Sequence, residues 1–170
     1  MGIFGKLFGK KESTQDPPGV GLRLMALTTP VNKLGFTSDN DFPNVYGVLT
    51  DWNIGEVTAT VMSMRDGTAS LYTTSTFGVI GGQGHDNVRH AAVQHVQLAE
   101  QFNKLGKLVT DFPYPKSGQV NFYILTYDGV RLHIVNESAI DQGTDPEYSL
   151  FASAQDVLTN LRLITEKENA

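Results

Sequence analysis

Residues 57–76 read VTATVMSMRDGTASLYTTST, and this stretch decides the fold. Val57 to Met64 alternates with a period of two, which is typical of a half-buried strand, with Val57, Ala59 and Val61 on one side and Thr58, Thr60 and Met62 on the other. Asp66-Gly67 follows at once, and Ser70 to Thr76 forms a second β-rich run. An Asp-Gly pair between two such runs predicts a β-hairpin with a type I′ turn, because that turn needs positive φ at both central residues.

The same signal recurs in residues 120–135, which read VNFYILTYDGVRLHIV and place Asp128-Gly129 between two β-rich runs. A second hairpin is therefore expected there. Between the hairpins, Asp86 is a suitable N-cap for a helix that starts at about Asn87. The predicted helix has one buried stripe, which predicts packing on a sheet. The residues of this stripe are Val88, Ala91, Ala92, His95, Val96, Ala99 and Phe102.

The remaining segments complete the pattern. Leu22 to Leu27 and Val45 to Thr50 are expected as strands, and the polar, turn-rich stretch Asn32 to Asn44 as a loop. Asp145-Pro146 supplies an N-cap and a proline at the first position of a final helix. The apolar stripe of that helix is Leu150, Phe151, Ala154, Val157, Leu158, Leu161 and Ile164.

This order of a β-meander, a helix, a hairpin and a helix predicts an α+β fold, with an antiparallel sheet of about five strands and helices packed on it. A chain of 170 residues suits one such domain. We expect the domain to span residues 20–165, after a basic, amphipathic leader and linker at 1–19 and before a frayed tail at 166–170. Profilin-like and roadblock-like regulatory domains use this element order, which makes them an analogy for the fold.

The composition excludes several classes of protein. The 13 basic and 18 acidic residues give a net charge of −5, which argues against a nucleic-acid partner. The absence of cysteine removes disulfides, thiolate metal sites and a cysteine nucleophile, and it favours a cytoplasmic location. No window approaches the roughly 18 apolar residues of a membrane span.

The first eleven residues differ in character from the rest of the chain. They contain three lysines and no acidic residue, so the net charge of positions 12–170 is −8. Helical spacing would gather the apolar side chains of this leader on one side, with lysines beside them. The residues expected to contact a membrane or a partner are Ile3, Phe4, Leu7, Phe8, Lys10 and Lys11. A weak anchor at the inner face of the membrane and a strip that docks on a partner are both open.

A glycine-rich junction links the first hairpin to the central helix. Free backbone N–H groups and the helix dipole favour an anion at such a place. The candidate ligand-binding residues are Gly81, Gly82, Gly84, His85 and Arg89. The junction matches neither the phosphate loop nor the dinucleotide fingerprint. The alternative interpretation is a tight strand-to-helix connection whose glycines relieve backbone crowding.

No metal site, cofactor or catalytic set is predicted. His85, His90 and His95 are five residues apart, which rotates each by about 140° from the last on a helix, so they cannot share one metal. His95 lies in the apolar stripe, where we expect a buried ring hydrogen-bonded to backbone. His133 has no evident partner, and no Gly-x-Ser-x-Gly elbow is present.

Several of these stretches together resemble a pattern that recurs in a family of uncharacterised bacterial proteins. The matching stretches are Asp66-Gly67-Thr68-Ala69-Ser70-Leu71-Tyr72, Gly78-Val79-Ile80-Gly81-Gly82, His85, Val88-Arg89, Asp128-Gly129-Val130, Leu150-Phe151-Ala152 and Leu161-Arg162. The resemblance covers roughly residues 45–163. It implies no activity, because that family carries none that could be transferred. Phe77-Gly78 stands where such proteins often have a glycine run, which argues further against a phosphate cradle.

The sequence leaves three hypotheses of function open. The first is a non-enzymatic regulatory or scaffolding module that acts through protein contacts, as a homodimer that uses a sheet edge or a helix surface. The second is a binder of small anionic ligands, or an enzyme, with its site at Gly81 to Arg89. The third is a peripheral membrane protein that is tethered through residues 1–11.

Overall fold

The computed structural model of the chain describes residues 16–75, 78–140 and 146–169. The strands are β1 (Val45–Ile54), β2 (Val57–Met64), β3 (Ala69–Thr73), β4 (Val79–Ile80), β5 (Lys107–Val109), β6 (Gln119–Thr126) and β7 (Gly129–Asn136). The α-helices are α2 (Pro18–Thr28), α3 (Val31–Leu34), α4 (Asp86–Ala99), α5 (Glu137–Ile140) and α6 (Pro146–Glu168). Two 3₁₀ turns, η1 (Gly82–Gly84) and η2 (Glu100–Phe102), flank α4.

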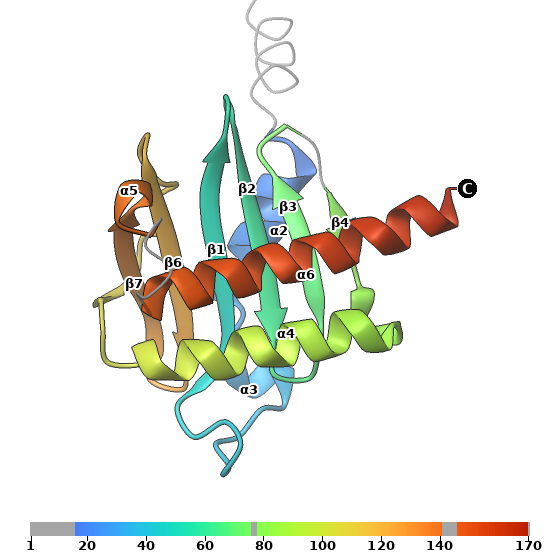
Figure 1. Cartoon of the computed structure of the whole chain (residues 1–170). Coiled ribbons are helices and arrows are strands. Elements are labelled where there is room, and N and C mark those ends of the chain that lie inside the picture. Colours follow the sequence, from blue (N-terminus) through green and yellow to red (C-terminus); the bar gives the residue numbers. More distant parts are fainter. Residues whose placement is uncertain (1–15, 76–77, 141–145, 170) are drawn as a thin grey trace, which may run out of the picture.

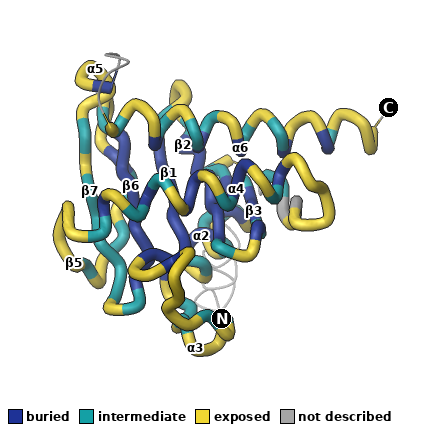
Figure 2. Tube along the Cα trace, turned by 60° about the horizontal axis from the view of Figure 1, so that its bottom comes forward, coloured by how far each residue is buried: buried dark blue, intermediate teal, exposed yellow. Residues whose placement is uncertain are grey.

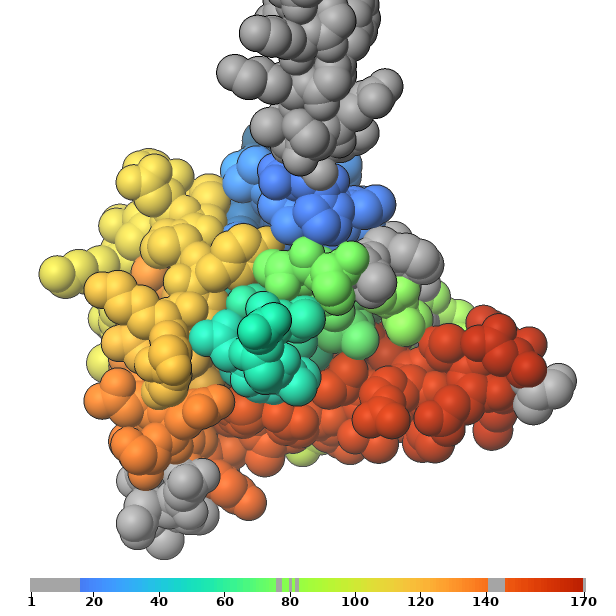
Figure 3. Space-filling view, turned by 90° about the horizontal axis from the view of Figure 1, so that it is seen from above, coloured from blue at the N-terminus to red at the C-terminus, as the bar shows by residue number. Residues whose placement is uncertain are grey.

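The strands form one antiparallel sheet with helices on both faces. The strand order is β4-β3-β2-β1-β6-β7-β5. Helices α4 and α6 lie side by side across one face, and α2 lies on the opposite face (Figure 1). Seen from above, α2 in blue and α6 in red stand on opposite sides of the strands (Figure 3). The predicted α+β class and antiparallel sheet are confirmed.

The sheet joins the predicted meander, β1-β2-β3, to the predicted hairpin, β6-β7. Strand β1 pairs with β2 on one side and with β6 on the other, so Asp51 is opposite both Thr60 and Asn121. The outermost strands, β4 and β5, lie outside the sequence prediction, because two and three residues are too few to show an alternating pattern.

Helices on both faces bury both sides of the central strands (Figure 2). Toward α4 and α6, the strands contribute Val48, Trp52, Val61, Phe122 and Ile124 to the core. Toward α2, they contribute Leu49, Met62, Met64, Tyr123 and Leu125. Polar side chains on these strands are therefore buried as well, and each needs a hydrogen-bonding partner inside the protein.

The strand predicted at Leu22 to Leu27 is wrong, because these residues belong to α2. Proline at the start of α2 fits a first helical turn, and Leu, Met and Ala are good helix formers. Arg23 and Leu27 lie one turn apart and are both buried against the sheet. The predicted loop from Asn32 also contains helical residues, since α3 forms a single turn there.

The type I′ turn predicted at Asp66-Gly67 is also wrong, although the hairpin itself forms. Only glycines have positive φ among the described residues, and Gly67 has a φ of 90°. The Asp66 carboxylate accepts the N–H of Thr68 at 3.0 Å, which holds Asp66 itself in an ordinary conformation. The result is a three-residue loop in which glycine alone takes the left-handed position.

The helix boundaries differ slightly from those expected. Helix α4 begins at Asp86, and His85 takes the N-cap position that was predicted for Asp86. Helix α6 continues to Glu168, through part of the stretch predicted to fray.

The predicted N-cap Asp145 and the leader at positions 1–15 lie outside the described residues. None of the helices in the described part is long and apolar enough to cross a membrane.

Replacing Gly67 by alanine should destabilise the protein by about 2–4 kcal/mol. Positive φ strains an alanine by about 1–2 kcal/mol, and its Cβ would also lie 2.1 Å from Cγ of Arg89. Gly55→Ala is the matched control, because Gly55 has a φ of 64° but a Cβ added there would meet no atom within 4 Å. Urea denaturation should show the smaller loss for Gly55→Ala. Equal losses would contradict the packing of Arg89 on this turn.

Candidate functional site

The predicted glycine-rich junction packs against the turn between β2 and β3. Gly81 has a φ of 79°, Gly82 and Gly84 form η1, and His85 precedes α4. The Gln83 side chain donates to the backbone oxygen of Asp66 at 3.3 Å. The junction is thus a strand-to-helix connection that is anchored on the first hairpin.

The charges at this junction are already paired with one another. Arg89 forms an ion pair with Asp86 and donates to the backbone oxygen of Gln83 at 3.2 Å. His85 Nε2 lies 3.9 Å from a carboxylate oxygen of Glu168. An anion would have to compete with both carboxylates, so the geometry favours the structural interpretation, and an anion site here stays a prediction.

The leader residues lie outside the described part of the chain. This applies to every residue predicted to contact a membrane or a partner, namely Ile3, Phe4, Leu7, Phe8, Lys10 and Lys11. Elsewhere, no group of three metal-ligating side chains comes together within residues 16–75, 78–140 and 146–169.

A buried ion pair fastens α2 to the middle of the sheet. Arg23 Nη2 lies 2.5 Å from Asp51 Oδ2, and both side chains are almost fully buried. Thr60 donates to the other carboxylate oxygen at 2.5 Å. Burial raises the pKa of Asp51, and Arg23 and Thr60 oppose that rise. Burial also disfavours the charge on Arg23, but the Asp51 carboxylate outweighs it and raises the pKa of the guanidinium.

The same guanidinium holds the segment before β6. Arg23 Nη1 donates to the backbone oxygen of Phe112 at 3.0 Å, and the guanidinium lies 4.1 Å from the ring centre of Tyr114. Burial raises the pKa of Tyr123 to about 12, so its neutral hydroxyl donates to Pro113 at 2.5 Å. The sequence did not predict this network, because the stretch that contains Arg23 was expected to be a strand. In addition, the tertiary fold alone determines which groups surround a buried side chain.

Breaking this pair should cost about 3–5 kcal/mol, because either single change leaves a buried charge without its counter-charge. We expect Arg23→Met and Asp51→Leu each to lower the free energy of unfolding by that amount in urea denaturation. The double variant should recover most of the loss, since it removes both charges together. Additive losses in the double variant would show that the two side chains act independently.

His95 is buried between α4 and the sheet, but it does not bond to backbone as the sequence suggested. Its Nδ1 lies 2.9 Å from the Ser63 hydroxyl, and its Nε2 lies 3.3 Å from the Thr50 hydroxyl. Two hydroxyls on adjacent strands therefore satisfy both ring nitrogens. Burial lowers the pKa of His95 to about 3, so the ring stays neutral at neutral pH.

The stability of the protein should fall as the pH drops from about 6.5 toward 3. In this range the unfolded chain binds a proton on His95 but the folded protein does not, which costs about 1.4 kcal/mol per pH unit. His95→Gln keeps hydrogen-bonding groups and cannot titrate. Urea denaturation at pH 7 and pH 5 should show that the wild type loses about 2 kcal/mol more than His95→Gln. An identical pH dependence of the two proteins would contradict a buried neutral ring.

His133 has a partner that the sequence does not reveal. Its Nε2 lies 3.3 Å from a carboxylate oxygen of Glu147 on α6, and its ring packs on Phe102 and Phe122. This contact ties β7 to the start of α6, so it has a structural explanation.

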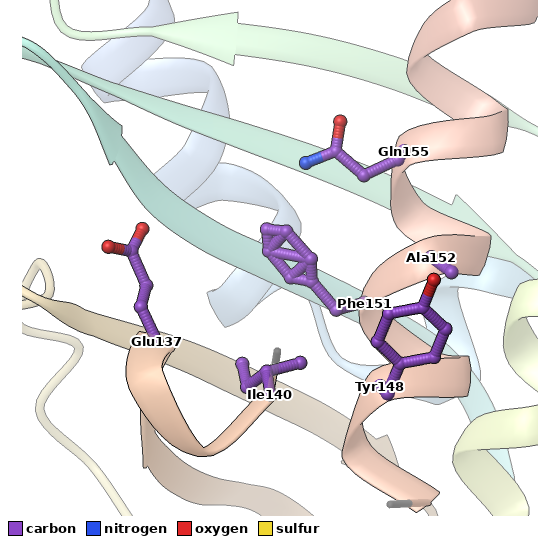
Figure 4. A pocket seen from close by; sticks show the side chains of 6 residues that line it. All are labelled: Glu137, Ile140, Tyr148, Phe151, Ala152 and Gln155. Atoms are coloured by element: carbon purple, nitrogen blue, oxygen red, sulfur yellow. The ribbon is translucent and has the colours of Figure 1, made fainter. Parts of the chain in front are cut away.

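A cavity of about 590 Å³ opens between α5 and α6. Its lining residues are Glu137, Ile140, Tyr148, Phe151, Ala152 and Gln155. The Phe151 ring lies between Glu137 on α5 and Tyr148 on α6 (Figure 4). Residues 141–145, which join the two helices, lie outside the described part of the chain, and we assign no site here.

A second hollow, which we call the methionine cleft, lies on the other face of the sheet. It has a volume of about 230 Å³ and is bounded by α2, α3, β2 and β3. Its lining residues are Leu22, Met25, Ala26, Thr29, Leu34, Phe36, Met62, Met64, Asp66, Thr68 and Tyr72. Three of the four methionines of the chain therefore line one cleft, which is mostly apolar.

The methionine cleft continues onto an apolar surface of α2. Leu24 is 50% exposed and Met25 is 60% exposed. Arg23 is the only charged residue of α2, and its side chain is buried. A helix surface without charge is normally covered in a folded protein, so this part of the molecule fits a binding surface.

Comparisons with protein-family models, curated proteins and solved structures find no match for this chain. We therefore infer a function from the geometry of the molecule itself.

Proposed function

We propose that the protein is a regulatory or scaffolding module that acts through protein contacts. The observation that carries this proposal is the methionine cleft together with the exposed apolar surface of α2. Methionine side chains are flexible and polarizable, so they adapt to different apolar partners. Asp66 and Thr68 supply polar groups at the rim that can orient a bound segment.

The polar groups of the core support a binding role over a chemical one. The Arg23–Asp51 pair and His95 are buried, and their hydrogen bonds hold elements of the fold together. None of these groups lines the methionine cleft. A partner bound there would meet carbon and sulfur atoms with a polar rim, which suits recognition of an apolar peptide segment.

A second copy of the chain is the partner that we propose first, as a homodimer in a cytoplasmic setting. The similarity of the element order to profilin-like and roadblock-like regulatory domains is an analogy in line with this proposal. The uncovered surface of α2 gives it a physical reason, because a symmetric dimer buries the same surface on both copies.

Sedimentation velocity over a range of concentrations tests the dimer. We expect self-association near micromolar concentration, and Met25→Lys should weaken it about tenfold or more by placing a charge in the interface. Leu163→Lys is the matched control, since Leu163 is similarly exposed on α6, on the opposite face of the sheet. A strictly monomeric wild type at high concentration would argue against the homodimer, and an equal effect of both variants would argue against the cleft.

A further inference from the structure

Helix α2 presents an apolar surface that the described residues leave uncovered. Its exposed positions are Pro18, Gly21, Leu24, Met25 and Thr28. A helix of this composition is stable when another element covers it, because exposed apolar area is unfavourable in water. A segment outside the described residues, or a partner, would bury this apolar surface if it covered α2 and filled the methionine cleft beside it.

We infer that residues 3–11 of the same chain dock along α2 and into the methionine cleft. This inference builds on the proposed function, because it names the segment that controls access to the proposed contact surface. The leader has apolar side chains at helical spacing, namely Ile3, Phe4, Leu7 and Phe8. A short helix docked in this way places those side chains against Leu22 and Met25 and forms a helical hairpin with α2.

The connecting chain has the right length for this arrangement. Residues 12–17 join the leader to α2, and connections between packed helices are commonly about 2–8 residues long. Fully extended, six residues span about 20 Å. The helix axis rises only about 10 Å from Pro18 to Met25. The leader therefore reaches the cleft of its own chain without strain.

The charges are complementary as well. The leader carries three lysines and no acidic residue, whereas the rest of the chain has a net charge of −8. Asp66 lines the methionine cleft and offers a carboxylate to a lysine of the docked leader. The short tether raises the effective concentration of the leader to the millimolar range, so even a weak contact is populated.

Docking of the leader makes it an intramolecular competitor for the partner. A partner that binds the cleft has to displace residues 3–11, so its apparent dissociation constant rises in inverse proportion to the fraction of molecules whose leader is undocked. A symmetric dimer needs both copies undocked, so a leader docked in nine of ten molecules weakens self-association about a hundredfold. Release of the leader is then the step that exposes the contact surface.

Methionine methyl NMR of the full chain tests the docking directly. Three of the four methionines line the cleft, so the ¹³C-methyl signals of Met25, Met62 and Met64 report on it. In Phe4→Ser/Phe8→Ser these signals should shift, and sedimentation should show self-association that is stronger by about a hundredfold. Ser13→Ala in the linker is the matched control. The single tryptophan, Trp52, packs on α6 and its indole signal should not move.

A spin label distinguishes docking within one chain from exchange between two copies. The protein has no cysteine, so Gly9→Cys gives a single labelling site. The label should broaden the signals of Met25, Met62 and Met64 when both are on one chain. Below the concentration at which the chain self-associates, it should have no effect when spin-labelled chains without ¹³C are mixed with unlabelled ¹³C-methionine chains. Broadening only in the mixture overturns docking within one chain.

Unchanged methionine signals in Phe4→Ser/Phe8→Ser, with no broadening, overturn the inference. Vesicles of phosphatidylserine and phosphatidylcholine separate it from a membrane anchor. Docking predicts that the methionine signals of the full chain differ from those of the double variant before any vesicle is added. If the two proteins already have the same signals without vesicles, and only the wild type floats with vesicles, the leader is a membrane anchor instead.

The two proposals fail in different ways. If the NMR signals report docking but the chain never self-associates, the leader inference holds and the homodimer is wrong. If Met25→Lys weakens self-association while the leader variant changes no methionine signal, the dimer holds and the leader inference is wrong.

Discussion

The ion pair between Arg23 and Asp51 fixes the relation between α2 and the sheet. A buried charge is costly unless it has a counter-charge and hydrogen bonds, so Arg23 can leave the sheet only at a large energetic cost. Its guanidinium binds the Asp51 carboxylate on β1 and the backbone oxygen of Phe112 at the same time. The position of α2 is therefore set by polar contacts on its inner side. The outer side of α2 carries no charged side chain, and this uncharged side is part of the candidate contact surface.

Burial on both faces is the second constraint, and it explains the chemistry of the core. Strand β1 lies between two strands and between two layers of helices, so its polar side chains need internal partners. The Asp51 side chain points to α2 and accepts hydrogen bonds from Arg23. The Thr50 side chain points to α4 and forms a hydrogen bond with His95. These buried polar residues thus connect the sheet to the helices on either side of it. Each connection joins segments far apart in the sequence, which favours a single arrangement of the fold.

The sequence predicted the parts of the fold that depend on local signals. The two hairpins, the central helix and the final helix follow from turn residues and periodicity, and all of them form. The helix at α2 was missed, because a short and mostly apolar run such as Leu22 to Leu27 is compatible with either a buried strand or a helix. The ion pair of Arg23 and the methionine cleft could not be predicted, since both depend on which face α2 covers. The turn type was wrong because a side-chain bond of Asp66 favoured another loop geometry.

The glycine-rich junction has a recognisable local sequence pattern, whereas the methionine cleft exists only in the folded protein. Glycines before a helix suggest a ligand when they are read alone, yet in the fold the junction packs on the β2–β3 turn, where Gln83 donates to the backbone oxygen of Asp66 and Arg89 lies against Gly67. Met25, Met62 and Met64 carry no motif at all, and they gather only because α2 and β2 meet. A contact surface made of apolar side chains from distant segments leaves almost no trace in sequence. The outer side of α2 differs in this respect. Arg23 is the only charged residue of this helix, so once Arg23 is known to be buried, the sequence alone shows that the outer side carries no charge.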